Sequence, residues 1–497
     1  SYLGRSRLVP ERATVMNRSE KSAEVIVAAR RRTEREGEST AMSFGTARHQ
    51  KPGQPGRTTE GEGEARPEAF RDEAGLARHV PEDSGRADLL GQVLARENLV
   101  LAWRRVKANR GSAGVDGLTI RATTEHLKTH WPRIRETLQN GSYRPQPVRR
   151  VQIPKSGGGM RELGIPTVMD RLIQQALLQV LQPLIDPTFS NHSYGFRPGR
   201  RAHDAVLTAQ HYVQEGYRVV VDVDLEKFFD RVNHDVLMDR LARRIDDKAV
   251  LRLIRRYLNA GVMGNGVVME RYEGTPQGGP LSPLLANVLL DEVDRELERR
   301  GHRFVRYADD CNVYVRSHKA GERVLEGLRK LYNRLHLKVN EAKSAVASAY
   351  GRAFLGYELW SSGGDMVKRG VAHKATVAFK RRIRQITRRT CGRNLSEVAE
   401  ELRRYVPSWK AYFKLAQTPK RFRELDEWLR HRLRALQLKH WRRGTTVYRE
   451  LRVLGASSDL AAQVAGNVCR WWRTSRLLLN WLMPIAYFDR LGVPRLS

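Results

Sequence analysis

The sequence has 497 residues, of which 40% are hydrophobic, enough for several globular domains with hydrophobic cores. Its 89 Lys and Arg residues outnumber its 55 Asp and Glu residues and give a net charge of +34 at pH 7. A surplus of this size predicts a polyanionic partner, most simply a nucleic acid. Three widely spaced cysteines, Cys311, Cys391 and Cys469, argue against a disulfide framework or a zinc site and favour a reducing cytoplasmic location.

The positive charge is concentrated near the end of the sequence. Residues 371–497 hold 28 Lys and Arg against 9 Asp and Glu, a net charge of +19 and more than half of the total excess. Arginines alternate there with aromatic residues, so phosphate contacts and base stacking are both available, although most of these aromatics would equally suit a helical core. No apolar run reaches the roughly 18 residues that span a bilayer, so no membrane partner is expected.

The first 86 residues are rich in Gly, Glu, Arg, Ser, Thr and Pro and lack apolar periodicity, which predicts a disordered N-terminal extension. Globular sequence begins near Asp88, where apolar residues recur at helical spacing. Residues 148–153 predict a strand that ends in a glycine-rich turn, and residues 174–184 predict a buried helix.

Further along the chain, strands and helices are both expected. Residues 217–225 alternate and are rich in Val, which predicts a strand, and residues 235–258, 284–300 and 320–335 predict helices. Short strands are expected around Val339 and Phe354, and almost the whole sequence after Val371 has a helical pattern. The sequence therefore predicts a mixed α+β part followed by a basic helical part.

Two adjacent carboxylates lie where the chain is expected to reverse direction. The apolar pair Phe304-Val305 leads into Tyr307-Ala308-Asp309-Asp310, and strand-like residues 312–315 follow. Asp residues at a turn are common, because Asp favours turns for its own backbone hydrogen bonding. Asp224, however, ends the predicted strand 217–225, and a buried strand ending in Asp is costly unless the carboxylate meets a cation. If Asp224 and Asp309 lie on neighbouring strands, they can bridge two Mg²⁺ ions roughly 4 Å apart.

Eight motifs follow one another from about Asp88 onward. They are Gly114-Val115-Asp116-Gly117; Ile153-Pro154-Lys155 with Arg161-Glu162-Leu163-Gly164-Ile165-Pro166; Ser193-Tyr194-Gly195-Phe196-Arg197-Pro198; Asp224 to Asp230 with His234; Gly274-Thr275-Pro276-Gln277-Gly278-Gly279-Pro280-Leu281-Ser282-Pro283; Tyr307 to Asp310; Leu337-Lys338-Val339-Asn340 with Lys343; and Phe354-Leu355-Gly356. In this order the motifs resemble those of group II intron-encoded reverse transcriptases with maturase activity, most closely the compact bacterial type.

The resemblance implies a right-hand polymerase, an α+β fold whose fingers and antiparallel palm sheet precede an all-α thumb. It implies fingers at 87–205, palm at 206–365, a helical thumb or maturase domain at 371–443 and a basic helical, DNA-binding tail at 444–497. Many relatives carry an HNH endonuclease with paired cysteines behind the thumb. No such motif is present in this sequence, which puts nicking of a target strand in doubt.

The resemblance also implies roles for individual residues. Asp224, Asp309 and Asp310 are expected to be catalytic, and together with Leu225 they form the expected metal set for two Mg²⁺ ions. The expected dNTP contacts are Lys155, Arg161, Phe229, Gln277 and Lys343, with Phe229 as a steric gate against the ribose 2′-hydroxyl. Phe354, Leu355 and Gly356 match the primer grip, and Arg404, Trp409, Lys410, Tyr412 and Lys414 match the RNA-binding part of the thumb.

The expected function is RNA-directed DNA synthesis by an intron-encoded enzyme that also promotes splicing and mobility of its intron. Its partners would be group II intron RNA, an RNA template with a DNA primer, dNTPs and a DNA target. Two alternatives remain open. One is a domesticated reverse transcriptase of the retron, diversity-generating or phage-defence type, and the other is an RNA-binding splicing factor with little polymerase activity.

Overall fold

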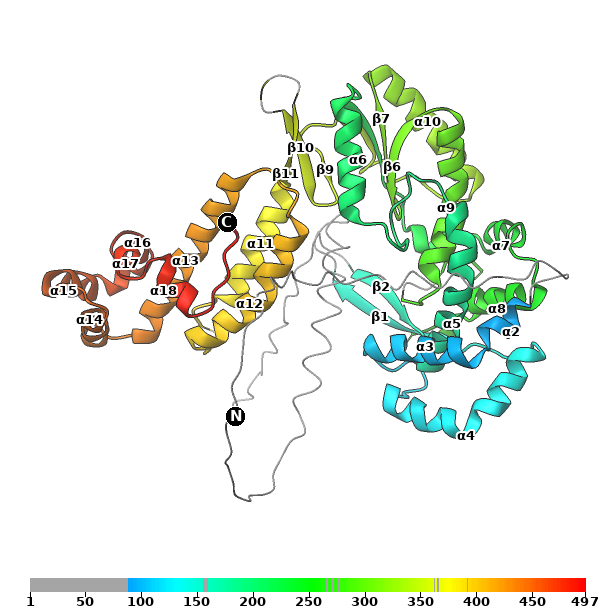
Figure 1. Cartoon of the computed structure of the whole chain (residues 1–497), viewed down its shortest axis with the longest axis horizontal. Coiled ribbons are helices and arrows are strands. Elements are labelled where there is room, and N and C mark those ends of the chain that lie inside the picture. The colour runs from blue at the N-terminus through cyan, green and yellow to red at the C-terminus, as the bar shows by residue number, and fades with distance from the viewer. Residues whose placement is uncertain are drawn as a thin grey trace, which may run out of the picture.

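The computed structural model describes residues 88–154, 160–264, 267–269, 272–275, 278–361, 363, 366–390 and 392–497. The extension expected at 1–86 lies outside these residues, as do Lys155 and Gln277. The described chain forms a helix-rich region near its start, a central sheet flanked by helices, and a helical region at its end (Figure 1).

Helices and a small sheet make up the first region. The helices are α2 (Leu89–Val93), α3 (Arg96–Ala108), α4 (Ile120–Gln139) and α5 (Val168–Ile185), and the sheet has the order β2-β1-β4-β5. Strands β1 (Val148–Pro154) and β2 (Met160–Ile165) form an antiparallel hairpin. Strand β4 (Val262–Gly264) pairs in parallel with β1, and β5 (Val267–Met269) pairs with β4. The later chain therefore returns to complete the sheet that β1 and β2 begin, and the fingers expected at 87–205 stay a prediction.

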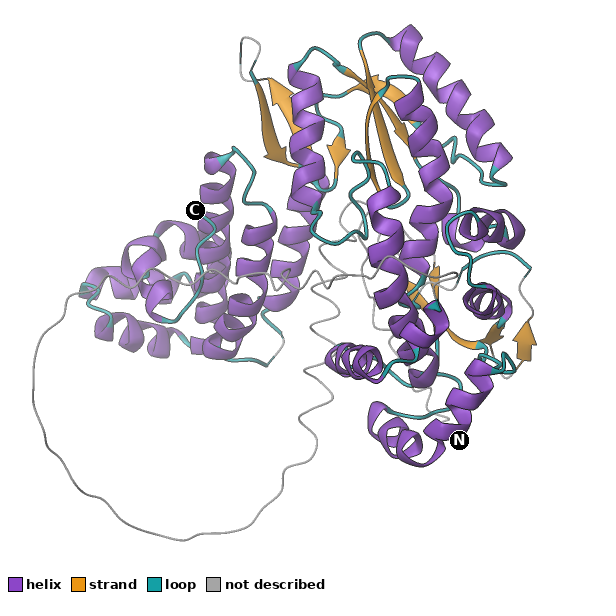
Figure 2. Cartoon of the chain, turned by 45° about the vertical axis from the view of Figure 1, so that its right-hand side comes forward, coloured by secondary structure: helices purple, strands orange, loops and turns teal. Residues whose placement is uncertain are grey.

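The central sheet is antiparallel and has the order β6-β7-β3-β8. It contains β3 (Val219–Val223), β6 (Arg303–Tyr307), β7 (Asp310–Val315) and β8 (Ala345–Ser348). Side chains alternate between its faces: Val221 and Val223 join a core with α9 (Ser282–Arg299) and α10 (His318–Arg334), while Val220 joins a core with α6 (Ala202–Gln214). The helices therefore cover both faces of the sheet (Figure 2).

One predicted helix is broken in two. Residues 235–258 form α7 (His234–Ala242) and α8 (Lys248–Asn259) instead of one continuous helix. Asp247 is the N-cap of α8, with its side chain accepting hydrogen bonds from the amides of Ala249 and Val250. The same carboxylate accepts a third bond from the amide of Leu90, so the break also connects α8 to the start of the described chain.

A second small sheet connects the central sheet to the helical region. It has the order β11-β10-β9 and contains β9 (Ala353–Phe354), β10 (Tyr357–Ser361) and β11 (Val367–Val371). The predicted strand near Phe354 is therefore present, whereas Val339 forms only an isolated bridge with Leu225.

The helical region comprises α11 (His373–Ile386), α12 (Leu395–Tyr412), α13 (Pro419–Trp441), α14 (Gly444–Val453), α15 (Ser458–Gly466), α16 (Trp471–Leu477), α17 (Leu479–Leu482) and α18 (Ile485–Arg490). Its last segment folds back onto the earlier helices. Phe488, Val493 and Leu496 are buried in the same core as α12 and α13. The Asp426 carboxylate of α13 accepts hydrogen bonds from the amides of Leu496 and Ser497. Residues 485–497 therefore help to complete the helical core. The tail expected at 444–497 thus includes residues that pack in this core.

Candidate active site

Strand pairing brings the predicted carboxylates to one end of the central sheet. In the β3–β7 ladder Asp222 lies opposite Asn312 and Val223 opposite Cys311, so Asp224 directly follows the last paired residue of β3 and Asp310 directly precedes that of β7. Directly opposed residues of an antiparallel pair have Cβ atoms about 5 Å apart and point to the same face. Asp309 is in the loop between β6 and β7, at this same end.

Asp224 is held by the segment that follows α10. Its amide donates to Ser344 Oγ at 3.0 Å, and its carbonyl accepts from the amide of Asn340 at 2.8 Å. Lys343 Nζ lies 3.4 Å from Asp224 Oδ2, while 60% of the Lys343 side chain is exposed. Asp224 itself is only 7% exposed. The lysine therefore compensates a buried carboxylate and remains accessible from solvent.

The β6–β7 hairpin has a tight loop whose backbone is in contact with Gly195. Tyr307 pairs with Asp310, so only Ala308 and Asp309 lie between them, and Ala308 has a φ of 57°. Gly195 packs directly on this loop, since a Cβ atom built on it would lie 2.2 Å from the amide nitrogen of Ala308. The glycine is therefore required for this close approach.

A buried arginine fixes the hairpin from inside. Arg306 on β6 and Asp294 on α9 both have fully buried side chains, and Arg306 Nε donates to Asp294 Oδ1 at 2.8 Å. The remaining guanidinium nitrogens donate to Asn287 Oδ1, Ser193 Oγ and the carbonyl of Ala308. Burial raises the pKa of Asp294, and the guanidinium of Arg306 opposes that shift. Nothing in the sequence pattern singled out either residue.

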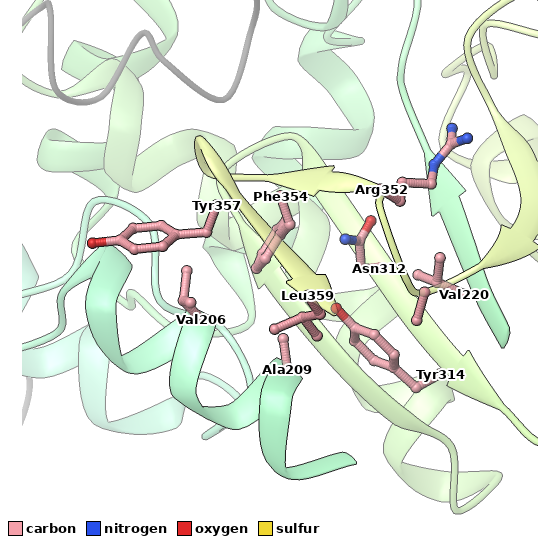
Figure 3. A pocket seen from close by; sticks show the side chains of 10 residues that line it. Val206, Ala209, Val220, Asn312, Tyr314, Arg352, Phe354, Tyr357 and Leu359 are labelled. Atoms are coloured by element: carbon pink, nitrogen blue, oxygen red, sulfur yellow. The ribbon is translucent and has the colours of Figure 1, made fainter. Parts of the chain in front are cut away.

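A small cavity lies on the face of the central sheet that carries Asn312 and Tyr314. Its volume is about 20 Å³, room for about one water molecule. Asn312 and Tyr314 of β7 and Phe354 and Tyr357 of the second sheet are among its lining residues (Figure 3). The cavity therefore separates the central sheet from the expected primer grip.

Asp222 is near this cavity but is already neutralised. Arg352 Nε donates to Asp222 Oδ2 at 2.8 Å, and the Asn312 amide, with its nitrogen facing Asp222, donates to Oδ1 at 3.1 Å. Burial raises the pKa of Asp222, and the guanidinium of Arg352 opposes that shift. Asp222 is thus a structural carboxylate inside β3. Asp224 follows the last residue of β3, and Asp310 is the first residue of β7.

Among the predicted nucleotide contacts, Phe229 is half-buried and lies against Phe228, with the ring centroids 5.0 Å apart. The Thr275 amide donates to the Phe229 carbonyl at 2.7 Å, so the motif that contains Gln277 passes next to Phe229. The backbone of Arg161 pairs with Ile153 near the tip of the β1–β2 hairpin. Lys155 and Gln277 themselves are outside the described residues.

The expected primer grip is a two-residue turn between β9 and β10. Leu355 and Gly356 both have positive φ values, 50° and 80°, while Phe354 pairs with Tyr357. This is the conformation of a type I′ turn. Tyr412 at the end of α12 donates from its hydroxyl to the Leu355 carbonyl at 2.8 Å, so the helical region supports the turn directly.

The residues expected to bind RNA do not share one environment. Arg404, Lys410 and Lys414 are exposed on α12 and just beyond it. Trp409 is 8% exposed and packs on Phe379 at a centroid distance of 4.5 Å. The expectation that Trp409 faces RNA is therefore not supported, because its ring belongs to the helical core.

The carboxylates suit a hard divalent cation, since Mg²⁺ prefers oxygen ligands and is usually held by one or two carboxylates together with substrate phosphates. Leu225 has a 1% exposed side chain and could contribute only its backbone carbonyl. In the described ranges no three His, Cys, Asp or Glu side chains form a ready metal cluster. The described residues also contain no helix long and apolar enough to span a membrane.

Comparison with known families assigns both parts of the chain. Residues 153–359 match the model described as reverse transcriptase (RNA-dependent DNA polymerase), and residues 376–455 match the group II intron, maturase-specific domain. The first part is thus a reverse transcriptase domain. The chain thus combines a match to a reverse transcriptase domain with a match to a maturase-specific domain behind it.

Individual proteins are similar to parts of this chain. Protein YkfC of Escherichia coli (strain K12) is 38% identical over 218 residues, covering 43% of this chain and 57% of that protein. Group II intron-encoded protein LtrA of Lactococcus lactis subsp. cremoris is 30% identical over 345 residues, covering 56% of this chain and 57% of that protein. The chain thus spans little more than half the length of either relative. A solved partial Cas6-RT-Cas1–Cas2 complex has a TM-score of 0.34 and 26% identity, covering 52% of this chain and 46% of that chain.

Proposed function

We propose that this chain is the RNA-directed DNA polymerase of a group II intron, copying intron RNA into DNA and binding that RNA to promote splicing and mobility into a DNA target. The observation that supports the polymerase half is the β3–β7 pairing, because β3 ends at Val223, directly before Asp224, opposite Cys311 of the hairpin that carries Asp309 and Asp310. Convergent carboxylates at strand ends suit transfer of a nucleotidyl group from a dNTP to the primer 3′-hydroxyl, with pyrophosphate as the leaving group.

The metal set is Asp224, Asp309 and Asp310, with the backbone carbonyl of Leu225. Two Mg²⁺ ions held there would activate the primer 3′-hydroxyl and neutralise the charge that develops on the leaving pyrophosphate. Lys343, whose ammonium is largely exposed and lies 3.4 Å from Asp224 Oδ2, would be within reach of a triphosphate bound at this site.

Fingers and palm residues hold the nucleotide in this proposal. Lys155 acts as a point charge and Arg161 as a guanidinium fork on the triphosphate, while Gln277 packs on the incoming nucleotide. Phe229 excludes a ribose 2′-hydroxyl, and its half-buried position next to the Thr275 amide supports this gate. The turn at Leu355 and Gly356 supports the primer 3′ end, with α12 behind it.

The helical region would bind RNA and the template–primer duplex through exposed cations. Lys380 and Arg384 on α11 lie 5.7 and 5.5 Å from the ring centroid of Trp428 on α13. Arg404, Lys410 and Lys414 extend the positive surface along α12. Shape and phosphate contacts dominate recognition of structured RNA, which suits this arginine-rich surface.

Primer extension on an RNA template with a DNA primer, dNTPs and Mg²⁺ tests the polymerase half. The wild-type protein is expected to extend the primer with dNTPs and to discriminate against rNTPs, and Phe229→Ala is expected to reduce that discrimination. Absence of extension by the wild-type protein over a range of Mg²⁺ concentrations would contradict the proposal.

Splicing of a group II precursor RNA at low Mg²⁺, with and without protein, tests the RNA half. The Asp309→Asn variant should stimulate splicing as the wild-type protein does, because RNA binding does not need the metal site. Polymerase activity without stimulation of the cognate intron would favour a domesticated enzyme, and the reverse result would favour a splicing factor. The match of residues 376–455 to the maturase-specific domain supports the intron-bound function.

A further inference from the structure

One exposed aromatic residue beside the active site has a backbone conformation that a bulky side chain rarely adopts. Seven non-glycine residues in the described part of the chain have positive φ, and three belong to site motifs: Lys227 after Asp224, Ala308 before Asp309, and Leu355 in the primer-grip turn. Phe196 is a fourth, with a φ of 61°. Gly, Asn and Asp enter this region readily, but for a bulky residue it is a genuine outlier.

The residues on either side hold Phe196 in this conformation. Gly195 is pressed against the backbone of Ala308, and its carbonyl accepts a hydrogen bond from Asn287 Nδ2 at 2.9 Å. Arg197 is 8% exposed, and its guanidinium donates to the Asp186 carboxylate at 2.9 Å and to the carbonyls of Ser190 and Ser193. Both neighbours are thus anchored in the protein, and the strain falls on Phe196.

The Phe196 side chain makes few contacts with the rest of the protein. Phe196 is 46% exposed, and within the described ranges its ring joins no hydrophobic core cluster and pairs with no other ring or cation. Its neighbour Gly195 touches Ala308, and Asp309 follows directly. Consecutive Cα atoms are about 3.8 Å apart, so the exposed ring starts only a few residues' length from the metal-binding loop.

We propose that Phe196 is a stacking platform for a nucleobase of the template–primer duplex at the polymerisation site. Aromatic rings bind bases of any sequence, because every base presents a π-face. The strained backbone then has a function, since it holds the ring toward the duplex instead of letting it collapse onto the protein. This inference rests on the proposed polymerase function and adds a duplex contact to it.

The Phe196→Asn variant separates binding from folding, because Asn tolerates the left-handed conformation while it lacks the ring. The midpoint of its urea unfolding should equal or exceed that of the wild-type protein. Its Kd for an RNA–DNA template–primer should rise about 5- to 100-fold, the range for loss of one stacked base. Phe196→Tyr should bind like the wild-type protein, since the ring is retained.

His336→Asn is the matched control, because His336 is exposed, has a φ of 57° and lies at the end of α10, before the segment that holds Asp224. This variant should unfold at a similar or higher urea midpoint with no change in Kd. The Kd comparison should also be made in the Asp309→Asn background, where extension is absent and binding alone is measured. Primer extension by the wild-type protein reports on the proposed function separately.

Equal template–primer affinity of Phe196→Asn and the wild-type protein would contradict the proposal that Phe196 stacks on a base of the duplex. A change confined to the KM for dNTP would overturn it as well, because the ring would then contact the incoming nucleotide and not the duplex. Weaker duplex binding by both Phe196→Asn and Phe196→Tyr would also contradict it, since stacking does not require the exact ring.

Discussion

Arg306 and Asp294 form an ion pair with no exposed surface on either side chain, and Arg306 also donates a hydrogen bond to the Ala308 carbonyl at 2.9 Å. A buried ion pair is weak evidence for stability, because desolvation of the two charges offsets their attraction. Its position is more informative, since this guanidinium connects α9 to the loop that carries Asp309. We infer that the pair holds the hairpin that carries Asp309 in place.

Breaking this pair should destabilise the fold, and replacing it should not. Arg306→Met leaves Asp294 as an uncompensated buried charge and should lower the free energy of unfolding by about 3–5 kcal/mol. The double variant Arg306→Met/Asp294→Leu should recover most of that loss in urea unfolding. Primer extension should stay well below wild type in the double variant, because the Ala308 carbonyl and Ser193 still lack their donor. Wild-type extension by a stable double variant would contradict the positioning role.

The contact between Gly195 and Ala308 should be intolerant of a single methyl group. Gly195→Ala puts a Cβ atom 2.2 Å from the Ala308 amide nitrogen, so the hairpin must shift. Displacement of catalytic groups by about 1 Å can reduce a rate about 100-fold. The rate of primer extension by Gly195→Ala should therefore fall by up to about 100-fold. The Kd for template–primer should change less.

Gly199→Ala is the matched control for this methyl group. Gly199 directly follows the same motif and has a φ of 68°, and a Cβ atom there would meet nothing within 4 Å. Its substitution should cost only about 1–2 kcal/mol of left-handed strain and leave extension near wild type. Equal extension rates for the two alanine variants would show that the close approach has no catalytic consequence.

His192 should make stability depend on pH. Burial lowers the pKa of His192, assisted by Arg303 and Arg200 and opposed by Glu298 and Asp294. The unfolded chain then binds the proton at a higher pH, near 6.5, than the folded protein does. Stability should therefore be complete above that pH and fall as the pH decreases toward the lower folded pKa.

The measurement is the urea midpoint of the wild-type protein and of His192→Gln between pH 7.5 and 5.5. The wild-type midpoint should fall more steeply on acidification than that of the variant, which has no proton to bind at this position. Parallel curves for the two proteins would show that His192 makes no net contribution to the pH dependence.

The basic surface around Trp428 should determine how binding responds to salt. Each duplex phosphate contact adds about 0.9 to the slope of log affinity against log salt. The double variant Lys380→Gln/Arg384→Gln should therefore reduce the slope for template–primer binding by up to about 2. Lys128→Gln is the control, because Lys128 on α4 is exposed and paired with Glu125. An unchanged slope in the double variant would place the duplex on another surface.

Local sequence patterns were sufficient for the elements that carry the carboxylates. The valine-rich strand before Asp224 and the reversal at Asp309 are both present, because alternation and turn chemistry are local signals. The break between α7 and α8 could have been predicted from Asp247, a good N-cap residue in the middle of an otherwise helical pattern.

The supporting contacts could not be predicted in the same way. Arg306 and Asp294 look like ordinary surface charges until β6 packs on α9, and their burial is a property of the tertiary structure. Trp409 is an aromatic residue of the kind that stacks on RNA bases, but in the structure its ring packs on Phe379. The return of Leu496 to Asp426 joins segments that are 70 residues apart, which no local pattern records.

The most direct test of the account is primer extension by Asp309→Asn beside the matched variant Asp235→Asn, whose exposed carboxylate pairs with Arg255 on the surface. Asp309→Asn should bind template–primer with wild-type affinity and extend it at a rate lower by several orders of magnitude. Asp235→Asn should extend the primer like the wild-type protein. Robust DNA synthesis by the Asp309→Asn variant would contradict the assignment of the hairpin as part of the catalytic metal site.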